Sequence, residues 1–161
     1  MALHFERAEF DARVAAARAA LRREGLAAIL LFAQESHFYL TGFDTSGFVF
    51  FQCLYLGADG RMALLTRAPD RLQAAQTSVV EDVRIWVDAP DASPATELRA
   101  LLDEIGCRGR RLGVEWEAYG LTARNGQRLS AALDGFCTLP DASDLVSRLR
   151  VGELGRALHH A

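Results

Sequence analysis

HFYLTGFDTSGFVFFQCLYLG, residues 37–57, is the most aromatic stretch of the chain, and the predicted architecture is built outward from it. Polar and glycine residues interrupt its apolar character once, over residues 42–47. Residues 48–56 are rich in aromatic and β-favouring side chains and too few to span a bilayer, which indicates a buried strand. The stretch therefore predicts a loop between two buried runs, and its aromatic residues are Phe38, Tyr39, Phe43, Phe48, Phe50, Phe51 and Tyr55.

The residues before this stretch predict a helix followed by a buried strand. Over residues 5–23, apolar side chains recur at helical spacing and most arginines lie elsewhere on the wheel, which is typical of an amphipathic helix. Gly25 then provides a helix stop, and residues 26–32 form a continuous apolar run suited to a central strand. This order of elements predicts an α/β domain.

The residues after the aromatic stretch continue the alternation of strands and helices. Two apolar runs on either side of a Gly/Asp turn at residues 57–60 predict a β-hairpin. The other predicted elements are strands at 83–87, 112–116 and 136–139 and helices at 68–78, 94–105, 121–133 and 142–150. Together they predict an α/β fold, a mixed β-sheet flanked by helices, in one domain over residues 1–150.

Composition narrows the classes of partner. The chain has 161 residues, half of them hydrophobic, and its 18 basic and 21 acidic residues give a formal net charge of -3. Because no basic run occurs, nucleic acid is not an expected partner. No apolar run approaches the ~20 residues of a membrane helix and no signal peptide is evident, so we expect no membrane contact and a cytoplasmic location. The three cysteines are widely spaced, which favours free thiols.

Few side chains are candidates for chemistry. Asp44 lies between aromatic residues that would desolvate it and raise its pKa, although the simpler interpretation is an ordinary turn aspartate. Glu115 forms either an acid pair with Glu117 or, more simply, a strand-end carboxylate bonded to backbone or to an arginine. The histidines form no metal-binding pair. The sequence therefore predicts no catalytic residue and no metal site, and the chain alone is not expected to be an enzyme.

Four motifs in register resemble one protein family. They are RREGL at residues 22–26 before an apolar strand, YLTGF at 39–43, LGVE at 112–115, and DAS at 141–143 followed by LVSRLR at 145–150. The set resembles the N-terminal domain of the creatinase/prolidase/aminopeptidase P family and covers nearly the whole chain. The aromatic run after the loop is most similar to Xaa-Pro peptidases and to creatinase-like or ectoine-hydrolase-like members.

The resemblance implies a division of labour. Enzymes of this family join such a domain to a larger catalytic domain of the "pita-bread" fold, which holds two divalent metals on carboxylates and a histidine. Those ligand motifs have no counterpart in this sequence, so the resemblance implies a non-catalytic accessory domain with no cofactor of its own. Such a domain packs in homodimers and covers the catalytic pocket. By this resemblance, the residues expected to contact substrate or the partner catalytic domain are Phe43, Asp44, Phe48 and Phe50.

One departure from the family pattern concerns the end of the chain. The family continues after its LR element with Lys-Ser, whereas here Arg150 is followed directly by VGEL at residues 151–154. Residues 151–161 are therefore expected to be either a helical tail or the start of a linker to a catalytic domain. The alternative function is a standalone module that binds a small molecule or a protein, with no hydrolase partner.

Overall fold

The sheet at the centre of the molecule has five strands. The computed structural model describes residues 5–45 and 50–159. Its strands are β1 (Ala28–Leu31), β2 (Cys53–Gly57), β3 (Met62–Arg67), β4 (Val83–Trp86) and β5 (Leu112–Val114). They lie in the order β4-β3-β2-β1-β5, so that β2 is central and β4 and β5 are the edges.

The strand directions make this a mixed sheet, as predicted. Strand β2 runs antiparallel to both of its neighbours, β1 and β3, and β2 and β3 form the predicted hairpin. Strand β4 is parallel to β3, and β5 is parallel to β1. Four strands therefore share one direction, and the segments that follow them emerge at the same edge of the sheet.

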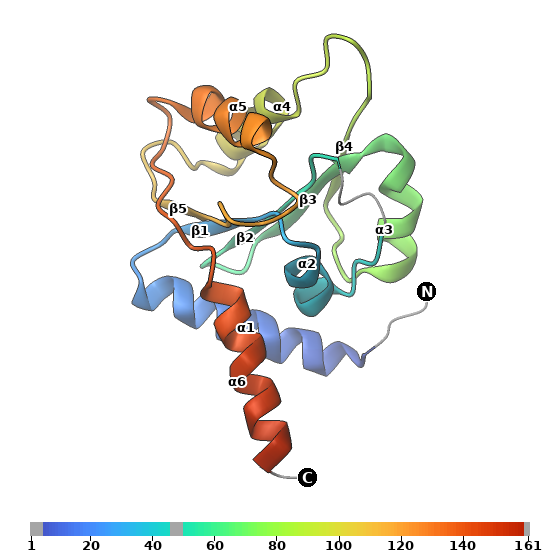
Figure 1. The fold of residues 1–161 in the computed structure, drawn as a ribbon, viewed down its shortest axis with the longest axis vertical. Coiled ribbons are helices and arrows are strands. Elements are labelled where there is room, and N and C mark those ends of the chain that lie inside the picture. The colour runs from blue at the N-terminus through green and yellow to red at the C-terminus, as the bar shows by residue number, and fades with distance from the viewer. Residues whose placement is uncertain (1–4, 46–49, 160–161) are drawn as a thin grey trace.

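Helices cover both faces of the sheet (Figure 1). Their bounds are α1 (Arg7–Arg23), α2 (Gln34–Thr41), α3 (Arg71–Thr77), α4 (Pro94–Ile105), α5 (Ala123–Leu133) and α6 (Leu145–His159), and a short 3₁₀ turn, η2 (Ala68–Asp70), precedes α3. Side chains of α1, α2, α3 and α6 pack in one core cluster, and side chains of α4 and α5 pack in the other. The fold is the predicted α/β arrangement.

Two-sided burial explains the continuous apolar run at the first strand. Ala28 and Leu30 point into the cluster beneath α4 and α5, while Ile29 and Leu31 point into the cluster beneath α1 and α2. Successive side chains of a strand face opposite sides, so a strand covered on both faces has no polar alternation. Gly25, with φ of +68°, lets the chain leave α1 in a left-handed conformation and enter β1.

The aromatic stretch differs from its prediction in two ways. The buried run before the loop is a helix, α2, which ends at Gly42 in a left-handed conformation (φ of +79°). Because α2 is buried on most sides, its sequence lacks the polar face that marks a surface helix. The strand predicted at residues 48–56 begins at Cys53, since Phe50 and Phe51 precede the ladder, and residues 48 and 49 lie outside the described part of the chain.

The strand predicted at residues 136–139 does not form. Only isolated bridges join this segment to the edge strand, between Arg111 and Thr138 and between Val114 and Asp141. The segment still lies against β5, because the Leu112 N–H donates to the Thr138 carbonyl at 2.9 Å. Just after the segment, Ala142 packs on Gly113, where an added Cβ would come within 2.7 Å of the Ala142 Cβ. The absence of a side chain at Gly113 allows this close approach.

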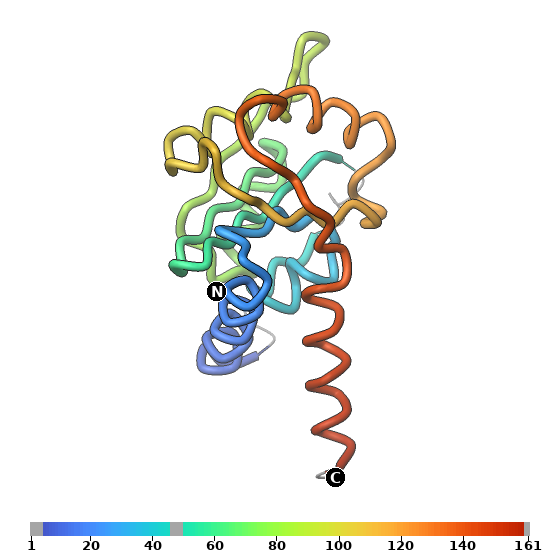
Figure 2. Tube along the Cα trace, turned by 90° about the vertical axis from the view of Figure 1, so that its left-hand side faces the viewer, coloured from blue at the N-terminus to red at the C-terminus, as the bar shows by residue number. Residues whose placement is uncertain are grey.

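Helix α6 projects from the body of the molecule (Figures 1 and 2). Its first residues, Leu145 and Val146, are buried against the cluster beneath α1 and α2. The sequence predicted a helix at 142–150 that residues 151–161 could extend as a helical tail, and α6 continues to His159 without interruption. The predicted division between a domain at 1–150 and a tail at 151–161 therefore falls inside one helix.

Candidate functional site

The loop of the aromatic stretch lies at the edge of the sheet where four strands end. Strands β1, β3, β4 and β5 run in the same direction, and the chain enters β2 from this same edge. Ligands of α/β sheets usually bind outside the carboxyl ends of the strands, because loops from several strands converge there. We call the residues gathered here the carboxyl edge, and they form the candidate functional site.

Glu115, directly after β5, anchors the start of α2. Its side chain is 3% exposed. One carboxylate oxygen accepts hydrogen bonds from the backbone N–H groups of Phe32 and Ala33, both at 2.9 Å, and the other accepts from the Ser36 hydroxyl at 2.7 Å. Glu115 thus bonds the N–H of Ala33, the N-cap residue of α2, and the Ser36 side chain in its first turn, which joins the start of α2 to the end of β5.

Two effects oppose each other on the Glu115 carboxyl group. Burial raises its pKa above the ordinary value, and the hydrogen bonds from Ser36, Ala33 and Phe32 act in the opposite direction. The interpretation of a strand-end carboxylate bonded to backbone is confirmed. The alternative acid pair does not form, because Glu117 is exposed on the surface while Glu115 points inward.

A chain of polar side chains holds the base of the loop. The Gln34 amide donates to the Phe43 carbonyl at 2.9 Å, and the Gln52 amide donates to Gln34 Oε1 at 3.2 Å. The Thr66 hydroxyl in turn donates to Gln52 Oε1 at 3.2 Å. Gln52 and Thr66 are buried, so these bonds replace water and connect α2, both ends of the loop and β3.

The outer side of the loop is attached to the segments after β3 and β4. The Arg67 guanidinium carbon lies 3.6 Å from the centroid of the Phe50 ring, which is a cation–π contact. Arg67 also approaches Asp70 at 3.9 Å and Asp88 at 3.7 Å. On the other end of the loop, the Thr45 hydroxyl donates to Asp70 Oδ1 at 2.9 Å.

The predicted contact residues occupy different environments. Phe43 is fully buried beside His37, and Phe50 is partly exposed beneath Arg67. Asp44 is exposed, so the alternative in which aromatic rings desolvate it is wrong, and the simpler interpretation of an ordinary surface aspartate remains; its backbone N–H donates to the Thr77 hydroxyl at 3.1 Å. Phe48 lies outside the described residues. Contact of these four residues with a substrate or partner domain stays a prediction.

A cluster that the sequence did not predict ties α2 to α6. The Tyr39 hydroxyl donates a short hydrogen bond to Glu153, and the Arg13 guanidinium donates to the same carboxylate at 3.1 and 3.3 Å. Arg13 also donates to the Tyr39 carbonyl at 3.1 Å and stacks on the Tyr39 ring at 4.4 Å. Burial, followed by the bond to Glu153, raises the pKa of Tyr39 to about 12.

The other features considered in the sequence are the histidines, metal ligands and membrane helices. His37 is fully buried, and its Nε2 lies 2.7 Å from the Leu31 carbonyl. Within residues 5–45 and 50–159, no group of three or more His, Cys, Asp or Glu side chains is arranged to hold a metal ion. Over the same ranges, none of the helices combines the length and apolarity needed to cross a membrane.

Comparison with known proteins identifies relatives over most of the chain. The model of the Creatinase/Prolidase N-terminal domain matches residues 13–151. An uncharacterized hydrolase/peptidase of Sinorhizobium fredii is 28% identical over 155 residues, and the ectoine hydrolase of Halomonas elongata is 26% identical over 157 residues. These alignments cover 92% and 93% of this chain but 39% of each relative.

A solved structure supports the same assignment. The N-terminal domain of the cytoplasmic peptidase PepQ from Mycobacterium tuberculosis superimposes with a TM-score of 0.68 at 29% identity, covering 86% of this chain and 98% of that one. The chain thus spans about two fifths of its curated relatives and nearly all of an N-terminal domain. The chain belongs to the Creatinase/Prolidase N-terminal domain family.

Proposed function

We propose that the chain is the non-catalytic accessory domain of a metal-dependent Xaa-Pro peptidase or creatinase-like hydrolase. In this role it covers the catalytic pocket and supports dimerisation, and the catalytic domain supplies the two divalent metals. The relatives carry the names hydrolase/peptidase and ectoine hydrolase, and they are much longer than this chain. The proposal places bond cleavage in the part of such proteins that this chain does not match.

The construction of the carboxyl edge supports a covering role. Hydrogen bonds from Gln34 and Gln52 fix the base of the loop, and Arg67 packs on Phe50 at its outer side. The loop is therefore fixed at its two ends, and it carries Asp44 on the protein surface. The described residues at the two ends of the loop, Asp44 among them, are therefore ordered before any contact with a neighbouring surface, which lowers the entropic cost of that contact.

The observation that carries the proposal is the apolar outer face of α6. Val151, Leu154 and Leu158 are 70%, 61% and 68% exposed. At 3.6 residues per turn, their spacing places them on one side of the helix, roughly opposite Leu145, Val146, Leu149 and Glu153, which face the body. An exposed apolar face on a helix that already packs by its other side supports contact with a second protein surface. We name these three side chains the α6 stripe.

The test of the non-catalytic role is a hydrolysis assay on the purified 161-residue chain. We expect no cleavage of Xaa-Pro dipeptides in the presence of Mn²⁺ or Co²⁺, because the proposal assigns the metals to the part of the longer relatives that this chain does not match. A family enzyme that includes the catalytic domain, assayed in parallel, shows that substrate and metal are active. Turnover that co-purifies with this chain through successive columns would contradict the proposal.

A further inference from the structure

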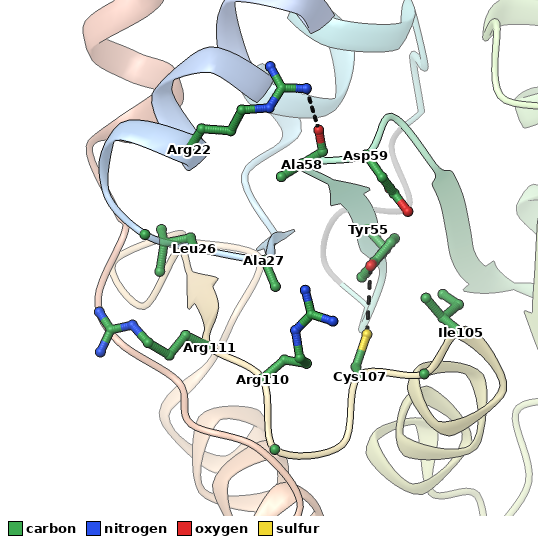
Figure 3. A pocket seen from close by; sticks show the side chains of 13 residues that line it. Arg22, Leu26, Ala27, Tyr55, Ala58, Asp59, Ile105, Cys107, Arg110 and Arg111 are labelled. Carbon is green, nitrogen blue, oxygen red and sulfur yellow. Dashed lines mark hydrogen bonds between the residues drawn. The ribbon is translucent and has the colours of Figure 1, made fainter.

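A cavity lies at the opposite edge of the sheet, where β1 and β5 begin (Figure 3). Its volume is about 550 Å³, and its walls are the end of α1, the turn between β2 and β3 and the loop between α4 and β5. Strands β1 and β5 are parallel, so this edge is the amino end of both and is separate from the carboxyl edge. The accessory function does not use this cavity.

The charge around the cavity is positive. Arg22, Arg110 and Arg111 line it together with one carboxylate, Asp59. Helices α1 and α4 end beside it, and a helix C-terminus carries roughly half a negative charge. Three guanidinium groups against one carboxylate and two such helix ends leave about one positive charge. The arginines therefore do more than neutralise the helix ends, although the whole chain is acidic.

The Arg110 side chain is positioned to bind a ligand in the cavity. Its side chain extends into the space between Ala27 and Tyr55 (Figure 3). It forms no ion pair or side-chain hydrogen bond with any residue in the described ranges. Arg22 lies on the far side of the cavity, where its guanidinium donates to the Ala58 carbonyl at 2.9 Å, so it contributes charge at the rim. Arg111 points away from this space, so it contributes charge rather than contact.

Tyr55 adds a neutral donor on the cavity wall. Its side chain is 4% exposed, and its hydroxyl oxygen accepts a hydrogen bond from the Cys107 thiol at 3.6 Å. A phenol has one proton to donate in addition to its lone pairs, and thiol sulfur is only a weak acceptor, so the Tyr55 hydroxyl can turn its proton from Cys107 to a stronger acceptor in the cavity. Burial raises the pKa of Tyr55, so the hydroxyl retains this proton.

We propose that this cavity binds a small oxyanion, a carboxylate or a phosphate, between Arg110 and the Tyr55 hydroxyl, with Arg22 and Arg111 adding positive charge at its rim. The planar guanidinium fork matches two oxygens of either group, and such charge-assisted bonds are among the strongest in proteins. The floor of the cavity is neutral and partly apolar, with Ala27 and Leu26 in the lining. This environment strengthens an electrostatic contact relative to the open surface.

The experiment is an NMR titration of the 161-residue chain with inorganic phosphate and, separately, with citrate. Sodium chloride at matched ionic strength serves as the reference. We expect saturable shifts of backbone amides in the turn at Ala58 and in the loop from Cys107 to Arg111. Saturation by phosphate alone assigns a phosphate site, saturation by citrate alone assigns a carboxylate site, and saturation by both assigns a general oxyanion site; each result supports the proposal.

Variants establish which residues bind the anion. Arg110→Gln is expected to weaken binding at least about tenfold, and Arg110→Lys, which keeps the charge and loses the fork, gives an intermediate loss. Arg128→Gln is the matched control, because it removes the same charge from the exposed side of α5. Tyr55→Phe keeps the ring and removes the donor, so it tests the site even if the Arg110 variants fold poorly.

Three results would overturn the proposal. The first is no saturable shift with either anion at millimolar concentration, and the second is an equal response to sodium chloride. The third is equal weakening by Arg110→Gln and Arg128→Gln, which would show that only net charge matters. If the Arg110 variants do not fold, unchanged binding by Tyr55→Phe decides against the site.

Discussion

Glu115 fixes the junction between β1 and α2 through three hydrogen bonds. Replacing it by alanine leaves the N–H groups of Phe32 and Ala33 without this acceptor, and unsatisfied buried donors are costly. We expect Glu115→Ala to lower the free energy of unfolding by roughly 2–4 kcal/mol. Urea denaturation measures this difference.

The near-isosteric variant Glu115→Gln provides the control for this prediction. Its amide oxygen can still accept from Phe32 and Ala33, and the Ser36 hydroxyl can turn to accept from the new amide nitrogen. The loss should therefore be clearly smaller than for alanine. Equal losses for the two variants would show that the three hydrogen bonds do not stabilise this junction.

His37 makes the stability of the domain depend on pH. Burial lowers its pKa from 6.5 to about 4 in the folded chain. As the pH falls from 6.5 to 4, the unfolded chain binds a proton that the folded chain does not, so stability falls across this window. The expected loss from this group is about 3 kcal/mol, and stability is unaffected by it above pH 7.

The variant His37→Gln isolates this contribution from the carboxylates that titrate in the same range. An amide can keep the hydrogen bond to the Leu31 carbonyl but has no proton to gain. Urea denaturation of both proteins between pH 7 and pH 4 should show a steeper loss for the wild type. Parallel pH curves would contradict the assignment of this dependence to His37.

At the scale of elements, Tyr39, Arg13 and Glu153 couple α2 to the outer half of α6. Removing the Tyr39 hydroxyl leaves Glu153 with Arg13 alone, so we expect Tyr39→Phe to loosen α6 from residue 150 onward. Hydrogen exchange followed by mass spectrometry should show faster exchange in this half of α6 and no change in α5. Tyr119→Phe, at a side chain that is 96% exposed, is the matched control. Unchanged exchange of α6 in Tyr39→Phe would contradict the coupling.

The same elements show how far the sequence predicts the fold. Amphipathic α1, the β2–β3 hairpin and the helix opened by Pro94 were predicted, because local periodicity and turn residues specify them. Helix α2 was not, since burial on most sides removes the polar face by which a helix is recognised. The start of β2 was predicted too early, because Phe50 and Phe51 are used outside the ladder: Phe50 packs against Arg67, and the Phe51 carbonyl accepts from the Trp86 ring at 2.8 Å.

The candidate site was predictable only in part for a related reason. A carboxylate at the end of a strand, such as Glu115, has few roles, and one of them was predicted correctly. Tyr39 and Glu153 are 114 positions apart, and no local pattern indicates that they meet. The bond from the Asp44 backbone N–H to the Thr77 hydroxyl of α3 likewise joins positions 33 residues apart, which no local pattern indicates.

At the scale of the whole molecule, helices cover both faces of the sheet, but nothing described covers the outer side of α6. Both core clusters are covered by helices, whereas the α6 stripe extends beyond the body with no described residue packed on its outer side (Figure 2). We therefore expect the domain to act through contacts with another protein surface. Its carboxyl edge and its projecting helix are the surfaces expected to contact a catalytic domain or a second copy.

Sedimentation equilibrium of the 161-residue chain tests this central claim most directly. We predict reversible self-association at high concentration, because the α6 stripe is an exposed apolar surface. The double variant Leu154→Glu, Leu158→Glu should sediment as a monomer, while Ala157→Glu, at an exposed position outside the stripe, should still associate. A strictly monomeric wild type, or association that persists unchanged in the double variant, would contradict the claim.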